Sequence, residues 1–197
     1  MTELAWASSG GGPLLAIDGA LAAAWRGVRP PVGARVPEGW SWGDGGIRCD
    51  YDRACDDMDD VVTTGDLVHT WSVPVADGRA LVLDGETATT AMPWDGGVLL
   101  ARNVPVALGA DHLAAMARAI PSDAWAVSSH VIPIASGRLF VFDSAATGDA
   151  DPEAMDADGV VVVETAPGRY RARFAASGPA ESDPAVLILL VREAQGC

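Results

Sequence analysis

The densest group of side chains that could do chemistry is an acidic run, with six carboxylates in the eleven residues from Asp50 to Asp60. Calcium and magnesium prefer several oxygen ligands that converge on one point, so a metal site is one reading of this run. However, the spacing matches no ligand loop, and no glycine stands where such a loop turns. A solvated acidic loop and a surface that receives a basic partner remain as the other readings. The carboxylates are Asp50, Asp52, Asp56, Asp57, Asp59 and Asp60.

A second acidic stretch runs from Asp149 to Asp158 and begins like an EF-hand loop. It departs from that motif at Ala154, where the loop needs glycine, and at Val160, where it needs a bidentate glutamate. The same three readings therefore apply: a metal site, a solvated loop, or a surface for a basic partner.

No catalytic constellation is recognisable in the chain. Its histidines, His69, His112 and His130, are scattered without the close spacing typical of zinc ligands. A nucleophile elbow and a Walker motif are both missing, and the chain has no lysine at all. The segment Ser8–Gly12 resembles a phosphate-binding loop, but Pro13 and a strand follow it in place of a helix. We therefore expect no catalytic residue, no metal and no cofactor.

The bulk composition limits the classes of partner. A formal charge of −14 on 197 residues opposes a phosphate backbone and an anionic membrane surface, so we expect neither nucleic acid nor membrane as a partner. Three cysteines without a CxxC pair fit a reducing compartment, and residues 1–12 do not resemble a signal peptide. The longest aliphatic run, Val186–Val191, is far too short to span a membrane. These features predict a cytoplasmic protein.

The elements that must position these groups are mainly strands. Alternating or continuous β-branched and aromatic residues predict strands at 14–17, 67–75, 80–84, 98–106, 127–134, 139–143, 160–164, 169–174 and 185–192. Two short helices are expected, one at 19–25 with Asp18 as its N-cap, and one at 110–120 that stops at Pro121. Residues 27–46 form a long loop rich in Pro and Gly that carries Trp40 and Trp42.

An internal repeat links the two halves of the strand region. The segment 73–84 recurs 59 residues later as 132–143, with six of twelve positions identical. This similarity predicts equivalent hairpins at 73–100 and 132–162, within related units at about 67–106 and 127–175. The two units would form one sandwich-like, pseudo-symmetric β body in a single domain that spans residues 1–197.

A stripe of three arginines lies in the predicted strand at 169–174. The period of two in a strand sends Tyr170, Ala172 and Phe174 inward and Arg169, Arg171 and Arg173 outward. One reading is a solvent face that pairs with acidic neighbours on the next strand. The other is an arginine-rich contact surface.

Six short blocks stand in order along the chain: Trp6 with Ser9 and Gly11–Leu15, Trp25–Gly27, Asp50–Cys55, Ala80–Leu83 with Thr89–Thr90, Phe142–Ala145, and Pro167–Tyr170. Together they resemble the twenty-first immunity-protein family of bacterial polymorphic toxin systems. The blocks cover nearly the whole chain in order, and the loops between 25 and 50 and between 56 and 66 are longer than the family leads us to expect. The most specific block is Asp-Tyr-Asp-Arg-Ala-Cys.

The resemblance implies a protein that binds and neutralises a cognate toxin in the cytoplasm and catalyses nothing. The toxin domain would be basic, as nuclease domains usually are, and the acidic surface would steer it into contact. The acidic run at 50–60 with Trp40 and Trp42 is then the predicted contact surface. Two other classes stay open: a ligand-binding β module with Trp40, Trp42 and Trp94 around a pocket, and a hydrolase with Asp50, Asp52 and Asp56 around a metal.

Overall fold

Two antiparallel six-stranded sheets form the body of the protein. The computed structural model describes residues 3–44, 46–57, 62–64, 67–177 and 184–194, and side chains at 62–64 and 67–69 are not described. In order across the sheet, sheet A contains β1 (Trp6–Ala7), β6 (Thr89–Trp94), β7 (Gly97–Arg102), β12 (Ala185–Arg192), β11 (Gly168–Ser177) and β8 (Ala126–Ile134). Sheet B contains β10 (Val161–Glu164), β9 (Arg138–Asp143), β2 (Leu14–Asp18), β5 (Gly78–Leu83), β4 (Leu67–Val75) and β3 (Val62–Thr64). The predicted mainly β, sandwich-like body is confirmed.

Three apolar clusters hold the layers together. The largest lies between the sheets and includes Leu14 and Leu81 from sheet B and Leu100, Tyr170 and Ile188 from sheet A. The other two lie on the outer faces of the sandwich, one under a helix and one under a cap of loops. Each sheet therefore buries apolar side chains on both faces, which accounts for the nearly continuous apolar runs in several strands.

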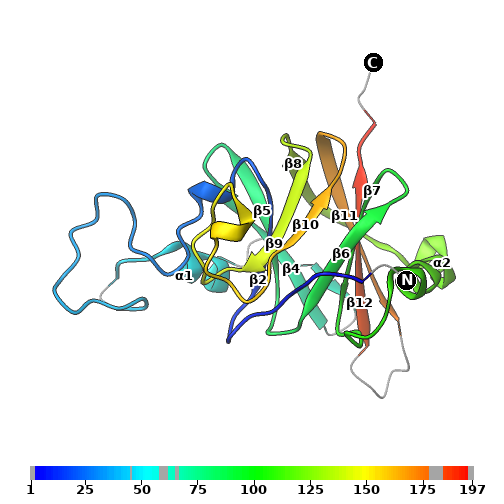
Figure 1. Ribbon diagram of the computed structural model, residues 1–197, viewed down its shortest axis with the longest axis horizontal. Coiled ribbons are helices and arrows are strands. Elements are labelled where there is room, and N and C mark those ends of the chain that lie inside the picture. Colours follow the sequence, from blue (N-terminus) through cyan, green and yellow to red (C-terminus); the bar gives the residue numbers. More distant parts are fainter. Residues whose placement is uncertain (1–2, 45, 58–61, 65–66, 178–183, 195–197) are drawn as a thin grey trace.

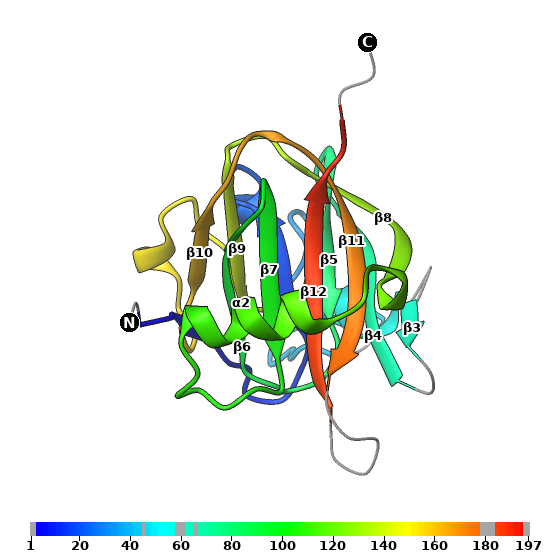
Figure 2. The same ribbon diagram turned by 90° about the vertical axis from the view of Figure 1, so that its right-hand side faces the viewer.

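The helix α2 (Ala110–Ala119) covers the outer face of sheet A. Its buried residues Leu113 and Ala117 pack with Leu99, Ala101 and Leu187 of the sheet. Figure 2 shows this helix lying across β7 and β12. The helix predicted at 110–120 is confirmed, because the apolar spacing and Pro121 dictate both its face and its end.

The cap covers the outer face of sheet B and is formed by residues 19–57 and 144–160, as far as they are described. It contains α1 (Asp50–Asp56) and the short 3₁₀ turns η1 (Ala22–Ala24) and η3 (Pro152–Ala154), while a third turn, η2 (Ser122–Ala124), follows α2. Trp25, Ala54 and Met155 from the cap pack on the sheet residues Val82 and Phe142. Figure 1 shows the cap on the side of the sandwich opposite α2.

The predicted helix at 19–25 is wrong, because only Ala22–Ala24 form a single 3₁₀ turn. Asp18 is 2% exposed and does not act as a helix cap. Its carboxylate accepts hydrogen bonds from the backbone N–H of Ala20 at 3.3 Å, of Ala135 at 2.8 Å and of Ser136 at 3.2 Å, and from the Ser136 hydroxyl. Asp18 therefore holds a turn that is distant in the sequence, in place of the predicted role as the N-cap of a helix.

The expectation of two equivalent hairpins is also wrong, although both copies of the repeat fold as strand, turn and strand. In the first copy, β4 and β5 pair with each other. In the second copy, β8 pairs with β11 in sheet A while β9 pairs with β2 and β10 in sheet B. The chain thus crosses between the sheets at 135–137, the turn that Asp18 holds.

The repeated strands β5 and β9 flank β2 on its two sides, but they do so in registers that differ by one residue. Leu15 pairs with Val82 on one side and with Phe142 on the other, although the repeat aligns Phe142 with Leu83. A slip of one residue sends every side chain to the opposite face. Leu83 accordingly lies between the sheets, whereas Phe142 lies under the cap.

Two of the three arginines on β11, Arg169 and Arg171, follow the first of the two readings. Tyr170, Ala172 and Phe174 are buried. Arg169 and Arg171 both pair with Glu193, just beyond the neighbouring strand β12.

Within the described residues, neither helix has the length and apolar character needed to cross a membrane.

We predict that Asp18→Ala lowers the free energy of unfolding by about 3 kcal/mol, because it removes the buried carboxylate that accepts from the N–H groups of Ala135 and Ser136 and from the Ser136 hydroxyl. Asp18→Asn keeps one acceptor oxygen and should lose less. Urea unfolding of each variant measures the change. As the matched control, Asp77→Ala removes an exposed carboxylate at the equivalent turn of the first copy and should change the free energy by less than about 0.5 kcal/mol. Equal losses at both turns would contradict the role given to Asp18.

Candidate functional site

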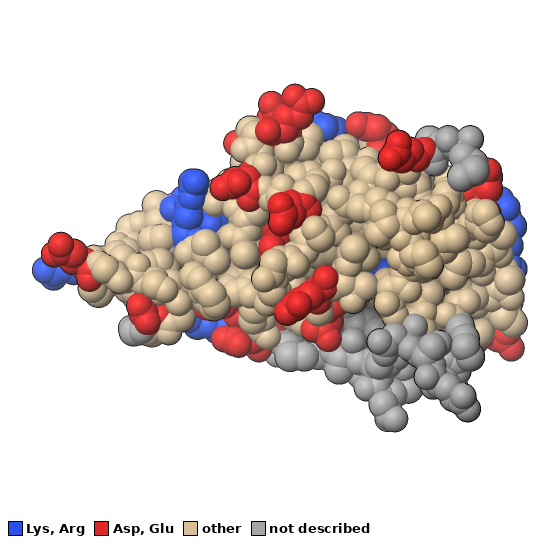
Figure 3. All heavy atoms as spheres, turned by 60° about the horizontal axis from the view of Figure 1, so that its bottom comes forward, with Lys and Arg blue, Asp and Glu red and all other residues tan. Residues whose placement is uncertain are grey.

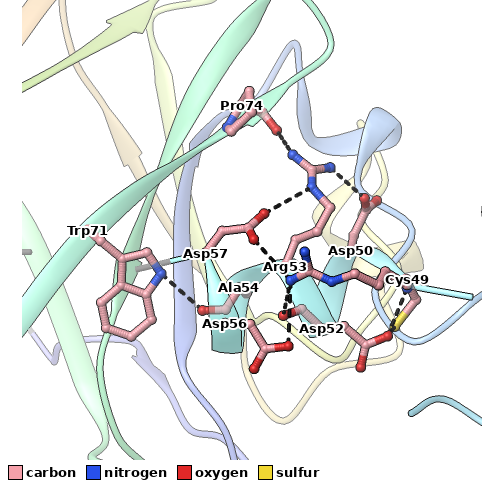
Figure 4. A network of polar contacts seen from close by, with 10 residues as sticks. Cys49, Asp50, Asp52, Arg53, Ala54, Asp56, Asp57, Trp71 and Pro74 are labelled. Atoms are coloured by element: carbon pink, nitrogen blue, oxygen red, sulfur yellow. Dashed lines mark hydrogen bonds and ion pairs between the residues drawn. The ribbon is translucent and has the colours of Figure 1, made fainter. Parts of the chain in front are cut away.

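The acidic block at 50–55 forms a helix, not the loop that the sequence suggested. At the N-terminus of α1, the Asp52 carboxylate accepts from the Cys49 backbone N–H at 2.8 Å and from its thiol at 3.1 Å. Acidic side chains in a first turn also interact favourably with the helix dipole. The helix ends where the Asp57 N–H bonds to the carbonyl of Arg53. Local capping therefore explains why this short segment is helical (Figure 4).

Most of the described carboxylates of this run have partners within the protein. Asp50 accepts from the backbone N–H of Arg26 at 2.8 Å and from Arg53 at 2.9 Å. Asp57 pairs with Arg48 at 2.9 Å, and Asp56 lies 3.5 Å from the same guanidinium. Asp59 and Asp60 lie outside the described residues. The helix thus presents a charge-compensated surface with Asp56 as its most exposed carboxylate.

The hydrolase reading needs Asp50, Asp52 and Asp56 to converge on one metal ion. Within the described residues, His, Cys, Asp and Glu form no group of three or more that could hold an ion. Asp50 and Asp52 instead bind separate backbone groups, Arg26 and Cys49. The geometry of the helix therefore contradicts the convergence of Asp50, Asp52 and Asp56 that the hydrolase reading requires.

The helix is fixed to its surroundings by three polar contacts and a buried tyrosine. The Trp71 indole donates to the Ala54 carbonyl at 3.0 Å, Arg53 donates to the Pro74 carbonyl, and the Tyr51 N–H donates to the Gly27 carbonyl at 3.1 Å. Burial raises the pKa of Tyr51 to about 12 and raises the pKa of Cys49 and of Cys55. The phenol and both thiols are therefore uncharged at neutral pH and act as packing groups.

A long loop, residues 28–47, projects from the cap and is called here the projecting loop. Apart from the bond of the Val28 N–H to the Ala145 carbonyl at its base, its described backbone hydrogen bonds close local turns, such as Trp40 N–H to the Pro37 carbonyl. Figure 1 shows the loop extending away from both sheets. Val32 is 83% exposed and Trp42 is 52% exposed. Trp40 is partly covered, and its indole donates to the Asp44 carbonyl at 3.1 Å. The projecting loop therefore offers apolar side chains to solvent.

The base of the projecting loop is joined tightly to the segment 144–148. The Trp25 indole donates to the Ser144 carbonyl at 2.8 Å, and the Gly148 N–H donates to the Trp25 carbonyl at 2.9 Å. Gly27 follows Trp25 by two residues and has a φ of +56°. A Cβ at Gly27 would collide with the carbonyl oxygens of Ala145 and Ala146. Only glycine accommodates both the left-handed backbone and this close approach.

The three tryptophans expected around one pocket lie on opposite sides of the sandwich, with Trp40 and Trp42 in the cap and Trp94 under α2. Trp94 packs against the cluster under α2, with the Arg118 guanidinium 5.0 Å from the centre of its ring. Trp42 belongs to the cap and lies edge-on to Tyr51, with ring centres 5.1 Å apart. The predicted pocket of Trp40, Trp42 and Trp94 is therefore wrong.

Trp42 lines one end of a groove made of three adjoining hollows that all border Ala145. The first hollow, of about 250 Å³, lies between the glycine loop 10–12, Trp42, Tyr51 and Asp143. The second, of about 340 Å³, continues past Asp143 to 156–158. The third, of about 290 Å³, lies between Val28, Arg29 and the segment 145–149, and also reaches Asp156. We call this combined feature the groove.

The pairing of β2 with β9 brings the walls of the groove together. The strands are antiparallel, with Leu14 opposite Asp143, so the segment that enters β2 lies beside the segment that leaves β9. The Ser9 hydroxyl accepts from the backbone N–H of Gly12 at 2.9 Å and shapes the loop. A Cβ at Gly12 would collide with the Tyr51 ring, so glycine is required for the tyrosine to form the wall.

The charge of the groove is mostly negative and is not neutralised internally. In the part of the chain that is described, no arginine lies within ion-pair distance of Asp143, Asp149, Asp156 or Asp158, in contrast to Asp50, Asp56 and Asp57. Asp143 is half-buried and accepts from the N–H of Gly10 at 3.3 Å and of Ala145 at 2.9 Å. Arg29 is the basic residue of the lining. Figure 3 shows acidic side chains spread from the projecting loop to the sandwich.

Comparison with known protein families identifies the family of this chain. The model of the family described as immunity protein 21 matches residues 5–183, most of its length. The chain belongs to the immunity protein 21 family. A search of curated proteins finds no match, and a search of solved structures finds none either. The family predicted from the six sequence blocks is thus confirmed.

The sequence indicated only some of the residues that form the groove. It singled out the stretch 149–158 as a surface that could receive a basic partner, and it singled out Trp42. It missed Asp143, Tyr51 and the glycine loop as members of one feature, because that grouping depends on a pairing between strands more than a hundred residues apart. The usable signal was that Gly10–Gly12 precedes one apolar strand and Asp143 ends another.

We predict that Gly27→Ala destabilises the protein by at least about 3 kcal/mol, because the left-handed backbone and the collision with Ala145 add together. Gly33→Ala is the matched control, since Gly33 also has a positive φ, of +79°, but meets no atom within 4 Å. It should cost about 1 kcal/mol or less. Chemical unfolding of both variants tests the comparison, and similar losses would show that the close approach at Gly27 is unimportant.

Proposed function

We propose that this protein neutralises a cognate bacterial toxin in the cytoplasm by binding it stoichiometrically, with no catalytic step of its own. The observation that carries the proposal is the family match over residues 5–183. The role of an immunity protein requires a surface that binds another protein specifically. Two features of the cap support the presence of such a surface. These are the exposed apolar side chains of the projecting loop and the adjoining acidic groove.

The charge of the protein supports a basic toxin domain, for which a nuclease is the expected class. A formal charge of −14 accelerates encounter with a basic partner through long-range attraction. Nuclease domains carry positive charge because they bind phosphate backbones. The proposed contact surface includes Trp40, Trp42 and the acidic residues of α1, with Asp50 and Asp52 holding the surface in shape through backbone contacts.

The cytoplasmic location is supported by the cysteines. Their odd number, three, fits a reducing compartment, and the described pair, Cys49 and Cys55, are free thiols. Both have a raised pKa because of burial, so they resist oxidation better than exposed thiolates do.

The proposal predicts one-to-one inhibition of the toxin encoded beside this protein. Titration of the purified toxin domain should abolish its activity at one equivalent, and the toxin should recover full activity after the complex is separated under denaturing conditions and refolded. Calorimetry measures the stoichiometry directly. Loss of toxin activity at a small fraction of one equivalent would indicate catalysis and contradict the proposal.

The acidic end of α1 should contribute mainly to the rate of association. We predict that Asp56→Asn with Asp57→Asn slows association with the toxin about threefold at low salt, because these charges steer encounter without being buried. The dissociation rate should stay nearly unchanged, and the difference should vanish at high salt. Stopped-flow kinetics at two salt concentrations tests this. Identical association rates at low salt would remove this end of α1 from the steering surface.

A further inference from the structure

We propose that the groove receives an arginine side chain of the toxin, with Trp42 and Tyr51 as its aromatic wall and Asp143, Asp156 and Asp158 as its counter-charges. This inference rests on the proposed function, because its occupant belongs to the toxin. It names the chemical feature of the partner that the groove recognises.

The first hollow has the shape of a receptor for one side chain. Glycine backbone at 10–12 forms one wall and leaves space that side chains would otherwise fill, while Trp42 and Tyr51 form another. The hollow opens into the section bounded by Asp156 and Asp158, with which it shares Gly10, Asp143 and Ala145. An extended segment of the partner can therefore lie along the groove with one side chain inserted beside Trp42.

The position of Trp42 is fixed even though half of its surface is exposed. Its edge-on contact with Tyr51 holds it at the rim, and Tyr51 is itself held by its packing against Gly12 and its bond to the Gly11 carbonyl at 3.4 Å. A partly exposed indole that packs against a buried ring at the rim of a hollow is a typical hot spot of a protein interface.

The electrostatics favour a cation at this place. Each oxygen of Asp143 already accepts one backbone N–H, and each retains a free lone pair that can accept a further donor. Asp156 and Asp158 are exposed and, among the described residues, have no arginine within ion-pair distance. An anion would be repelled, and a neutral side chain would leave these charges without compensation.

Arginine fits the groove better than lysine does. Its planar guanidinium can lie against an aromatic ring while it donates in a fork to a carboxylate, and the hollow places both kinds of group on its walls. The ammonium group of lysine is a compact, strongly hydrated charge that uses only one of these features. The carboxylates of α1 offer a weaker alternative, since Arg48 and Arg53 already occupy them.

The test measures binding of the cognate toxin domain to a set of variants of the full chain. We expect Trp42→Ala to weaken binding about 30-fold, mainly through faster dissociation, while Trp42→Phe retains most of the affinity. Asp156→Asn with Asp158→Asn should weaken binding about tenfold at low salt and much less at high salt. Val127→Ala is the control, because Val127 is also an exposed apolar residue, at 60%, but lies on β8 of sheet A and does not line the groove. It should leave binding unchanged.

A double-mutant cycle then identifies the occupant. Each surface arginine of the toxin is replaced by alanine in turn, and each variant is measured against the parent and against Trp42→Ala. One replacement should weaken binding to the parent about 30-fold and binding to Trp42→Ala much less. Tight binding of the parent with no arginine coupled to Trp42 would overturn this inference and leave the proposed function standing. Failure of the parent to bind the toxin would overturn both.

Discussion

The pairing of β2 with strands on both sides is the constraint on which the rest of the structure depends. All five residues of Leu14–Asp18 are buried, so the strand contributes to the core between the sheets on one face and to the core under the cap on the other. Its N-terminal end lies beside the C-terminal end of β9, which brings the glycine loop next to Asp143. Its C-terminal residue, Asp18, holds the turn where the chain passes from one sheet to the other. A single buried strand thus determines the layer arrangement, the crossover and the position of the groove.

Much of the fold could be predicted from local patterns, because most strands and α2 are specified by their own residues. The sequence placed β4, β5, β8, β9, β11 and β12 close to their observed bounds. It could not predict which strands pair, since apolar runs such as Leu139–Asp143 fit either sheet equally well. The repeat shows this limit clearly: similar residues in β5 and β9 face opposite sides, because pairing with β2 and not local sequence sets the register. The helix α1 was missed because a capping aspartate and a run of carboxylates resemble an acidic loop.

The site shows the same difference between features that local sequence determines and features that depend on contacts between distant residues. Composition and charge indicated an acidic surface for a basic partner, and Trp42 was identified as an exposed aromatic residue. Which carboxylates remain available is decided by arginines brought close in space, such as Arg53 beside Asp50 and Arg48 beside Asp57. Charge compensation of this kind depends on geometry. Among the described residues, three carboxylates of the run at 50–57 have arginine partners, whereas those of the groove have none.

The projecting loop has a consequence for how such a protein can diversify. The bond between the Tyr51 N–H and the Gly27 carbonyl joins the segments that flank this loop. Residues 31–39 are almost all exposed and belong to none of the three apolar clusters. The entropy cost of closing a loop grows slowly with its length, by about 0.6 kcal/mol for each doubling. Insertions, deletions and substitutions among residues 31–39 are therefore nearly neutral for folding while they reshape the surface beside the groove. Selection for recognition of a new partner can act on this segment almost independently of selection for stability, as it does on the hypervariable loops of antibodies.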